Sequence, residues 1–84
     1  AYAASKAGLG SLTQNVATQY GKQGIRCNAV APGVIATPSL EANVPRAAVD
    51  VYVENTLTPR LGRPEDIAAA VVFLASDASA FITG

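Results

Sequence analysis

The sequence predicts an α/β fold, and three observations along its 84 residues carry that prediction. A helical pattern is followed closely by a short apolar segment with the composition of a buried strand. A second helical pattern comes later, beyond a segment that five prolines interrupt. Because a helix that leads directly into an apolar strand is typical of half a βαβ unit, the expected sheet is parallel.

The first element is a helix over about residues 1–20. Apolar side chains fall at helical spacing along it and are expected to form one stripe: Leu9, Leu12, Val16 and Tyr20. The first half is rich in small residues and contains Gly8 and Gly10. Since a glycine inside a helix costs about 1 kcal/mol relative to alanine, these positions predict the close approach of another helix or a sheet.

The second element is a strand over residues 25–31, between Gly24 and the pair Pro32-Gly33. Strands of a parallel sheet are normally buried on both faces, so this one needs neighbouring strands. Within it, Asn28 is expected to tie the strand to an adjacent loop.

Residues 33–63 are expected to be irregular, apart from a short helix over about 45–55 with Pro45 in its first turn. Such a segment, after the carboxyl end of a parallel strand, is where ligands bind and lids form. A plain connector is the alternative. The last helix is expected from about Pro64, with Glu65 and Asp66 in its first turn. The buried face of this helix should contain four apolar residues: Ile67, Ala70, Val71 and Leu74. Residues 81–84 should begin another strand.

Composition excludes several classes of function. The chain is half apolar and has no net charge, so neither nucleic acid nor an anionic membrane surface is an expected partner. Its longest apolar run, residues 67–75, is far shorter than the roughly 20 residues needed to span a bilayer. With no histidine and one cysteine, no metal site is expected. Cys27 is expected to be a small core residue in a reducing, cytoplasmic setting. Because methionine is absent, we expect a C-terminal piece of a larger domain.

The chemistry is carried by Tyr2 and Lys6, which are four residues apart and so lie one helical turn apart on one face. A free phenol, with a pKa of about 10, is a poor proton donor or acceptor near neutral pH, and a nearby cation favours its phenolate. Such a pair is the acid/base that a carbonyl-reducing or alcohol-oxidising enzyme needs. Taken alone, the spacing more often reflects a surface lysine whose stem covers a tyrosine.

Three motifs in order strengthen the enzymatic interpretation: Tyr2-Ala-Ala-Ser-Lys6, Asn28-Ala-Val-Ala-Pro-Gly33, and Gly62-Arg-Pro-Glu-Asp66 leading to Phe73-Leu-Ala-Ser-Asp77 and Phe81-Ile-Thr-Gly84. Together they resemble the C-terminal third of the short-chain dehydrogenase/reductase family, in its classical branch. The resemblance implies a Rossmann-like, doubly wound parallel sheet, with the order helix, strand, substrate loop, helix and start of a strand. Residues 1–84 would then be a fragment of one Rossmann-fold domain, with 36–60 as its substrate-binding loop.

The same resemblance implies roles for individual residues. Tyr2 is the expected catalytic acid/base. Lys6 is expected to favour its phenolate and to hydrogen-bond the nicotinamide ribose. Four further residues are expected at the cofactor. Pro32 and Gly33 should shape the turn beside the nicotinamide. The Ile35 backbone should hold the carboxamide, and the Thr37 hydroxyl should also contact the cofactor. The substrate pocket is expected to include Leu40, Val44, Val49 and Tyr52.

The expected function is therefore hydride transfer between NAD or NADP and a small-molecule carbonyl or secondary alcohol. The apolar substrate loop favours a ketone with a hydrophobic body. The slim first helix resembles one that packs in the family's homodimers and homotetramers, so an oligomer is expected for the full-length protein. The isolated 84-residue chain is expected to be inactive. A non-catalytic binding or assembly module of the same fold is the alternative. Five residues that occur together disfavour it: Tyr2, Lys6, Pro32, Gly33 and Thr37.

Overall fold

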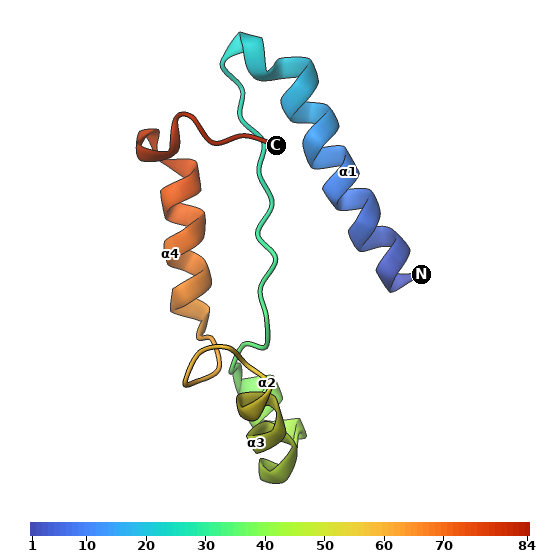
Figure 1. Ribbon diagram of the computed structural model, residues 1–84, viewed down its shortest axis with the longest axis vertical. Coiled ribbons are helices and arrows are strands. Elements are labelled where there is room, and N and C mark those ends of the chain that lie inside the picture. The colour runs from blue at the N-terminus through green and yellow to red at the C-terminus, as the bar shows by residue number, and fades with distance from the viewer. The chain divides into compact units, whose positions relative to one another are not determined.

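The computed structural model describes all residues, 1–84, and contains four α-helices, two short 3-10 helices and no strand (Figure 1). The helices are α1 (Tyr2–Tyr20), α2 (Pro38–Asn43), α3 (Arg46–Glu54) and α4 (Pro64–Ala75), with η1 (Gly21–Gln23) and η2 (Asp77–Ser79). They belong to two compact units, the first made of Ala1–Val30 with Val72–Gly84 and the second of Ala31–Val71. None of the helices combines the length and the apolar character needed to cross a membrane.

The first unit begins with α1, which ends where the glycines predict. Gly24 adopts the left-handed conformation, with φ of 82°, and its N–H donates to the Gly21 carbonyl oxygen. The buried residues of α1 are Thr13 and Ala17, whereas Leu9 and Leu12 are more than half exposed. The apolar stripe predicted for this helix is therefore not its buried face.

An extended segment follows Gly24, but it forms no ladder (Figure 1). Its pairing with the C-terminal residues consists of the Gly84 N–H donating to the Cys27 carbonyl (2.8 Å) and the Cys27 N–H donating to Thr83 Oγ1 (3.0 Å). The predicted strands at 25–31 and 81–84 are therefore wrong for this chain. A strand needs a row of hydrogen bonds to a neighbour, and these two segments share too few.

Arg26 is the main polar connection of the first unit. Its guanidinium donates to the carbonyl oxygens of Leu74 (2.9 Å) and Ser76 (3.1 Å), at the end of α4, and to Ser79 Oγ (2.9 Å). Carbonyl oxygens in the last turn of a helix have no hydrogen-bond donor within the helix. Arg26 supplies donors to these oxygens at the end of α4. Asn28, which was expected to tie its segment to an adjacent loop, instead donates from Nδ2 to the carbonyl of Ile82 (2.9 Å), near the C-terminus.

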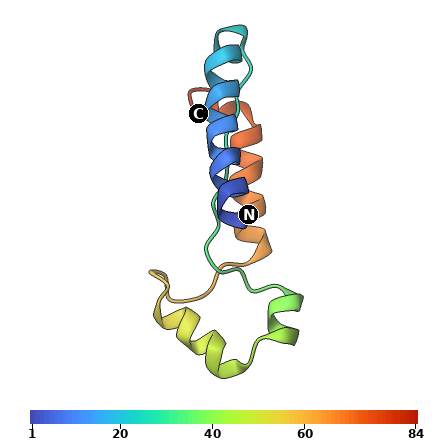
Figure 2. The same cartoon turned by 90° about the vertical axis from the view of Figure 1, so that its right-hand side faces the viewer.

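In the second unit, α2 and α3 are short and follow one another closely (Figure 2). Thr37 caps α2, since its Oγ1 accepts from the Leu40 N–H, and Pro38 occupies the first turn. This helix was not among the expected elements, although a threonine before a proline is a recognised helix start. The predicted helix at 45–55 is confirmed as α3, with Pro45 at its N-cap position instead of inside the first turn.

One isolated parallel β-bridge, between Ile35 and Gly62, brings the two ends of segment 36–61 together. The Ala36 N–H donates to the Gly62 carbonyl (2.8 Å), and the Gly62 N–H donates to the Val34 carbonyl (3.1 Å). We call this pair of hydrogen bonds the neck. The predicted last helix is confirmed as α4, with Glu65 and Asp66 in its first turn. The buried face predicted for it is wrong for this chain, because none of its residues is buried and Val71 is 49% exposed.

Candidate active site

Tyr2 and Lys6 lie together on the first turns of α1, as their spacing predicts. The Lys6 Nζ atom is 5.5 Å from the centroid of the Tyr2 ring. A cation over an aromatic ring at an exposed site is worth about 0.5–1 kcal/mol. The Ser5 hydroxyl donates to the Tyr2 carbonyl oxygen (2.8 Å), which adds a local contact to this turn.

The Tyr2 side chain is available to a ligand. The residue is 76% exposed, and α1 begins with no side-chain cap of its own. A phenol can both donate and accept a proton, and an ammonium offers three donors. The pair can therefore exchange a proton with a bound molecule while keeping a positive charge beside the phenol.

Pro32 and Gly33 stand at the start of the second unit, in extended and exposed chain. Gly33 has no positive φ, and a Cβ built on it meets no atom within 4 Å. Nothing within this chain therefore requires glycine at position 33.

Ile35 lies between Val34 and Ala36, whose backbone groups form the neck. The N–H and C=O of Ile35 itself point away from Gly62. In a parallel bridge, the residue whose neighbours are bonded directs its N–H and C=O to the opposite edge. Here the neck bonds use the Val34 carbonyl and the Ala36 N–H, so both backbone groups of Ile35 remain available. Two residues on, the Thr37 oxygen accepts from Leu40, which leaves its hydroxyl hydrogen free to donate.

The predicted substrate residues are only partly brought together. Val44 and Val49 line an open groove along α2 and α3, together with Val53 and a charged rim of Glu41, Arg46 and Asp50. Leu40 and Tyr52 are not among its lining residues. Val53 was missed as a site residue, although it lies one turn from Val49 on the same helix face.

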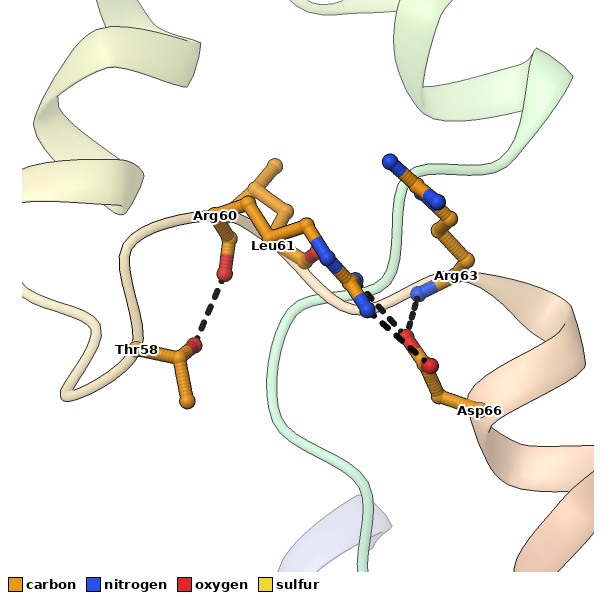
Figure 3. A network of polar contacts seen from close by, with 5 residues as sticks. All are labelled: Thr58, Arg60, Leu61, Arg63 and Asp66. Carbon is orange, nitrogen blue, oxygen red and sulfur yellow. Dashed lines mark hydrogen bonds and ion pairs between the residues drawn. The ribbon is translucent and has the colours of Figure 1, made fainter.

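A polar network that sequence reasoning did not find joins residues 60–63 to Asp66 at the start of α4 (Figure 3). Arg60 makes two hydrogen bonds to the Asp66 carboxylate (2.8 and 3.1 Å), and a third from its Nη1 to the Leu61 carbonyl (2.8 Å). The Arg63 N–H donates to the same carboxylate (2.8 Å). The bonds from Arg60 and then from Arg63 hold the pKa of Asp66 at about 2, below its ordinary 3.8. The sequence predicted only a helix start at residues 63–66.

Comparison with known proteins shows the family to which the chain belongs. A protein family described as "Enoyl-(Acyl carrier protein) reductase" matches residues 1–84. A probable short-chain type dehydrogenase/reductase from Bradyrhizobium diazoefficiens is 54% identical over 83 residues. The chain belongs to the short-chain dehydrogenase/reductase family.

Relatives with named activities include the 7alpha-hydroxysteroid dehydrogenase of Bacteroides fragilis, 49% identical, and the human (3R)-3-hydroxyacyl-CoA dehydrogenase, 53% identical. Each alignment covers 99% of this chain but only 32% and 31% of the relative, so the chain spans about a third of their length.

Solved structures show the same likeness. A 4-hydroxyisoleucine dehydrogenase complexed with NADH superposes with a TM-score of 0.85 and 38% identity, over 98% of this chain and 34% of that one. A short-chain dehydrogenase/reductase family oxidoreductase from Burkholderia thailandensis gives a TM-score of 0.88 and 40% identity, over 98% of this chain and 32% of that one. The helices and connections described above are therefore similar to those of about a third of these Rossmann-fold family members.

Proposed function

We propose that this chain is the C-terminal part of an NAD- or NADP-dependent oxidoreductase that interconverts a carbonyl and a secondary alcohol. The observation that carries the proposal is the exposed Tyr2 with Lys6 against its ring, on one helix face. It stands in a chain that matches named dehydrogenases over nearly all of its length. Such an enzyme would be a longer protein, the full-length protein, that contains these 84 residues.

The chain's own groups fit a nicotinamide cofactor. A carboxamide has one acceptor oxygen and one donor NH2, which complement the free N–H and C=O of Ile35. The Thr37 hydroxyl retains a donor, and the Lys6 ammonium offers donors suited to ribose hydroxyls. The bound cofactor would supply or accept the hydride. The assignment of Pro32 and Gly33 to the turn beside it stays part of the proposal.

The proton moves at the Tyr2 Oη atom. In reduction, this hydroxyl gives its proton to the carbonyl oxygen of the substrate, and in oxidation the phenolate takes the proton of the alcohol. The Lys6 ammonium, 5.5 Å from the ring centroid, keeps a positive charge beside the group that exchanges the proton.

The substrate is a small molecule with an apolar body. The groove along α2 and α3 presents Val44, Val49 and Val53 within a charged rim, a composition suited to an apolar chain or ring that carries a polar group. Leu40 and Tyr52 remain proposed contacts. The single free Cys27 supports a reducing, cytoplasmic setting.

The decisive experiment compares Tyr2→Phe with Tyr20→Phe in the full-length protein. Loss of the Tyr2 hydroxyl should lower kcat on a ketone substrate by about 10²- to 10⁴-fold, while cofactor affinity stays close to wild type. Tyr20→Phe removes the same atom from the other end of α1 and should leave kcat unchanged. If Tyr2→Phe also changes no activity, the chain is a non-catalytic binding or assembly module.

We also propose that α1 packs against a second copy of the full-length protein. A Cβ built on Gly8 or Gly10 would meet no atom within 4 Å beyond the backbone of α1 itself, and Leu9 and Leu12 are exposed. A charged residue here should prevent close helix packing. Leu12→Arg is therefore expected to lower the molar mass measured by light scattering to that of a smaller assembly, whereas Gln14→Arg, also on α1, serves as the matched control. Equal masses for the two variants would contradict this assignment.

A further inference from the structure

The two hydrogen bonds of the neck set the orientation of the Ile35 backbone, and neither involves Tyr2 or Lys6. Gly62 is hydrogen-bonded to the residues on both sides of Ile35, through the Val34 carbonyl and the Ala36 N–H. These two bonds fix the peptide planes on either side of Ile35. The direction of the free Ile35 N–H and C=O therefore depends on where the backbone of Gly62 lies.

Gly62 can approach this closely because it has no side chain. A Cβ built at this position would lie 2.5 Å from Ile35 Cδ1, closer than two carbon atoms can pack. Here the absence of a Cβ is a requirement of the close approach, because the φ of Gly62 is not positive.

Asp66 holds the chain on both sides of Gly62. Its carboxylate accepts directly from the Arg63 N–H, which follows Gly62. The same carboxylate binds Arg60, whose Nη1 also donates to the Leu61 carbonyl, which precedes Gly62 (Figure 3). Figure 3 shows the Arg63 side chain directed away from this carboxylate, so the Arg63 contribution is that of its backbone.

We propose that Asp66, acting through Arg60 and the Gly62 backbone, is a positioning residue for the carboxamide of the cofactor. Asp66 does not touch the cofactor. It fixes the residues around Gly62, Gly62 fixes the Val34 and Ala36 peptides, and these direct the free edge of Ile35. This role rests on the proposed function, because it needs a nicotinamide cofactor at Ile35.

The test measures cofactor discrimination in the full-length protein. The probes are the oxidised dinucleotide that the wild type prefers and its 3-acetylpyridine analogue, in which a methyl replaces the carboxamide NH2. The wild type should bind the natural dinucleotide up to about tenfold more tightly, because only the natural carboxamide can donate to the Ile35 carbonyl. Asp66→Asn keeps the shape of the side chain but loses the charged pairing with Arg60, and it should bring the ratio of the two Kd values toward one.

Two further variants separate positioning from general damage to the fold. Gly62→Ala should also lower the ratio, and Ile35→Val in the same chain should restore it, because valine lacks the Cδ1 atom that the new Cβ would meet. Asp77→Asn, which removes an exposed carboxylate in η2, is the matched control and should leave the ratio unchanged.

The outcomes distinguish this inference from the proposed function. The positioning role alone would be overturned if the wild type binds both dinucleotides and Asp66→Asn leaves the ratio of their Kd values unchanged. It would also be overturned if the wild type does not discriminate between the two dinucleotides. Failure of the wild type to bind either dinucleotide would overturn the proposed function itself, and this role with it.

Discussion

At the scale of single residues, Arg26 shows how one side chain can join distant parts of a chain. Its guanidinium contacts residues 48 to 56 positions away, among them Leu74, Ser76 and Ser79. Lysine keeps the charge but has no planar fork with several fixed donors. Arg26→Lys should therefore lower the free energy of unfolding by about 2 kcal/mol, the scale of lost hydrogen bonds to a charged group.

Urea denaturation of the full-length protein would measure this loss, with Lys22→Ala as control because Lys22 is exposed and lies in η1 nearby. A loss no larger than that of the control would contradict the role of Arg26.

Residues also show where sequence reasoning succeeds and where it stops. The proximity of Tyr2 and Lys6 could be predicted because helical periodicity fixes which residues share a face. The partners of Arg26 could not be predicted, because no local pattern indicates which distant carbonyls a residue outside the helices will contact. The bond between Arg60 and Asp66 is closer in sequence, but it depends on the turn of the chain at Gly62.

At the scale of elements, the start of α4 depends on an ionised carboxylate. Because the pKa of Asp66 is about 2 in the folded protein and ordinarily 3.8, folding favours the charged form. The contribution of Asp66 to stability is therefore complete above about pH 4 and is lost as the pH falls toward about 2. The wild type should exceed Asp66→Asn in stability at neutral pH, and the difference should shrink over that acid range.

Urea denaturation of both full-length proteins at several pH values would check this dependence, with Asp50→Asn as the control carboxylate. A difference between the wild type and Asp66→Asn that stays constant with pH would show that the charge of Asp66 is not the cause.

The helices could be predicted from sequence more completely than the sheet. The helices α1, α3 and α4 each follow a pattern contained within their own residues, and the Thr37-Pro38 signal of α2 was available but not recognised. The strands failed for another reason. A strand at 25–31 exists only if neighbours supply its hydrogen bonds, and residues 81–84 supply one backbone bond to it.

At the scale of the whole molecule, the chain lacks part of what a dinucleotide needs. No glycine-rich loop that could cradle a pyrophosphate leads into a helix in these residues, and the relatives are about three times as long. The isolated 84-residue chain should therefore not bind NADH or NADPH. Fluorescence titrations with NADH and NADPH would compare cofactor binding by the 84-residue chain with binding by the full-length protein. Saturable binding by the 84-residue chain would contradict this prediction.

The neck has a further consequence for how such a chain can diversify. The second unit is an insertion between Val30 and Val72 of the first, and the hydrogen bonds at Gly62 close that insertion near its base. The entropy of closing a loop rises only with the logarithm of its length, so doubling residues 38–59, which leave out Ala36, Thr37 and Arg60, would cost roughly 0.6 kcal/mol. Evolution or an engineer could thus exchange this segment for one of another length and composition, changing which molecules are accepted while Tyr2, Lys6 and the Arg26 contacts are inherited unaltered.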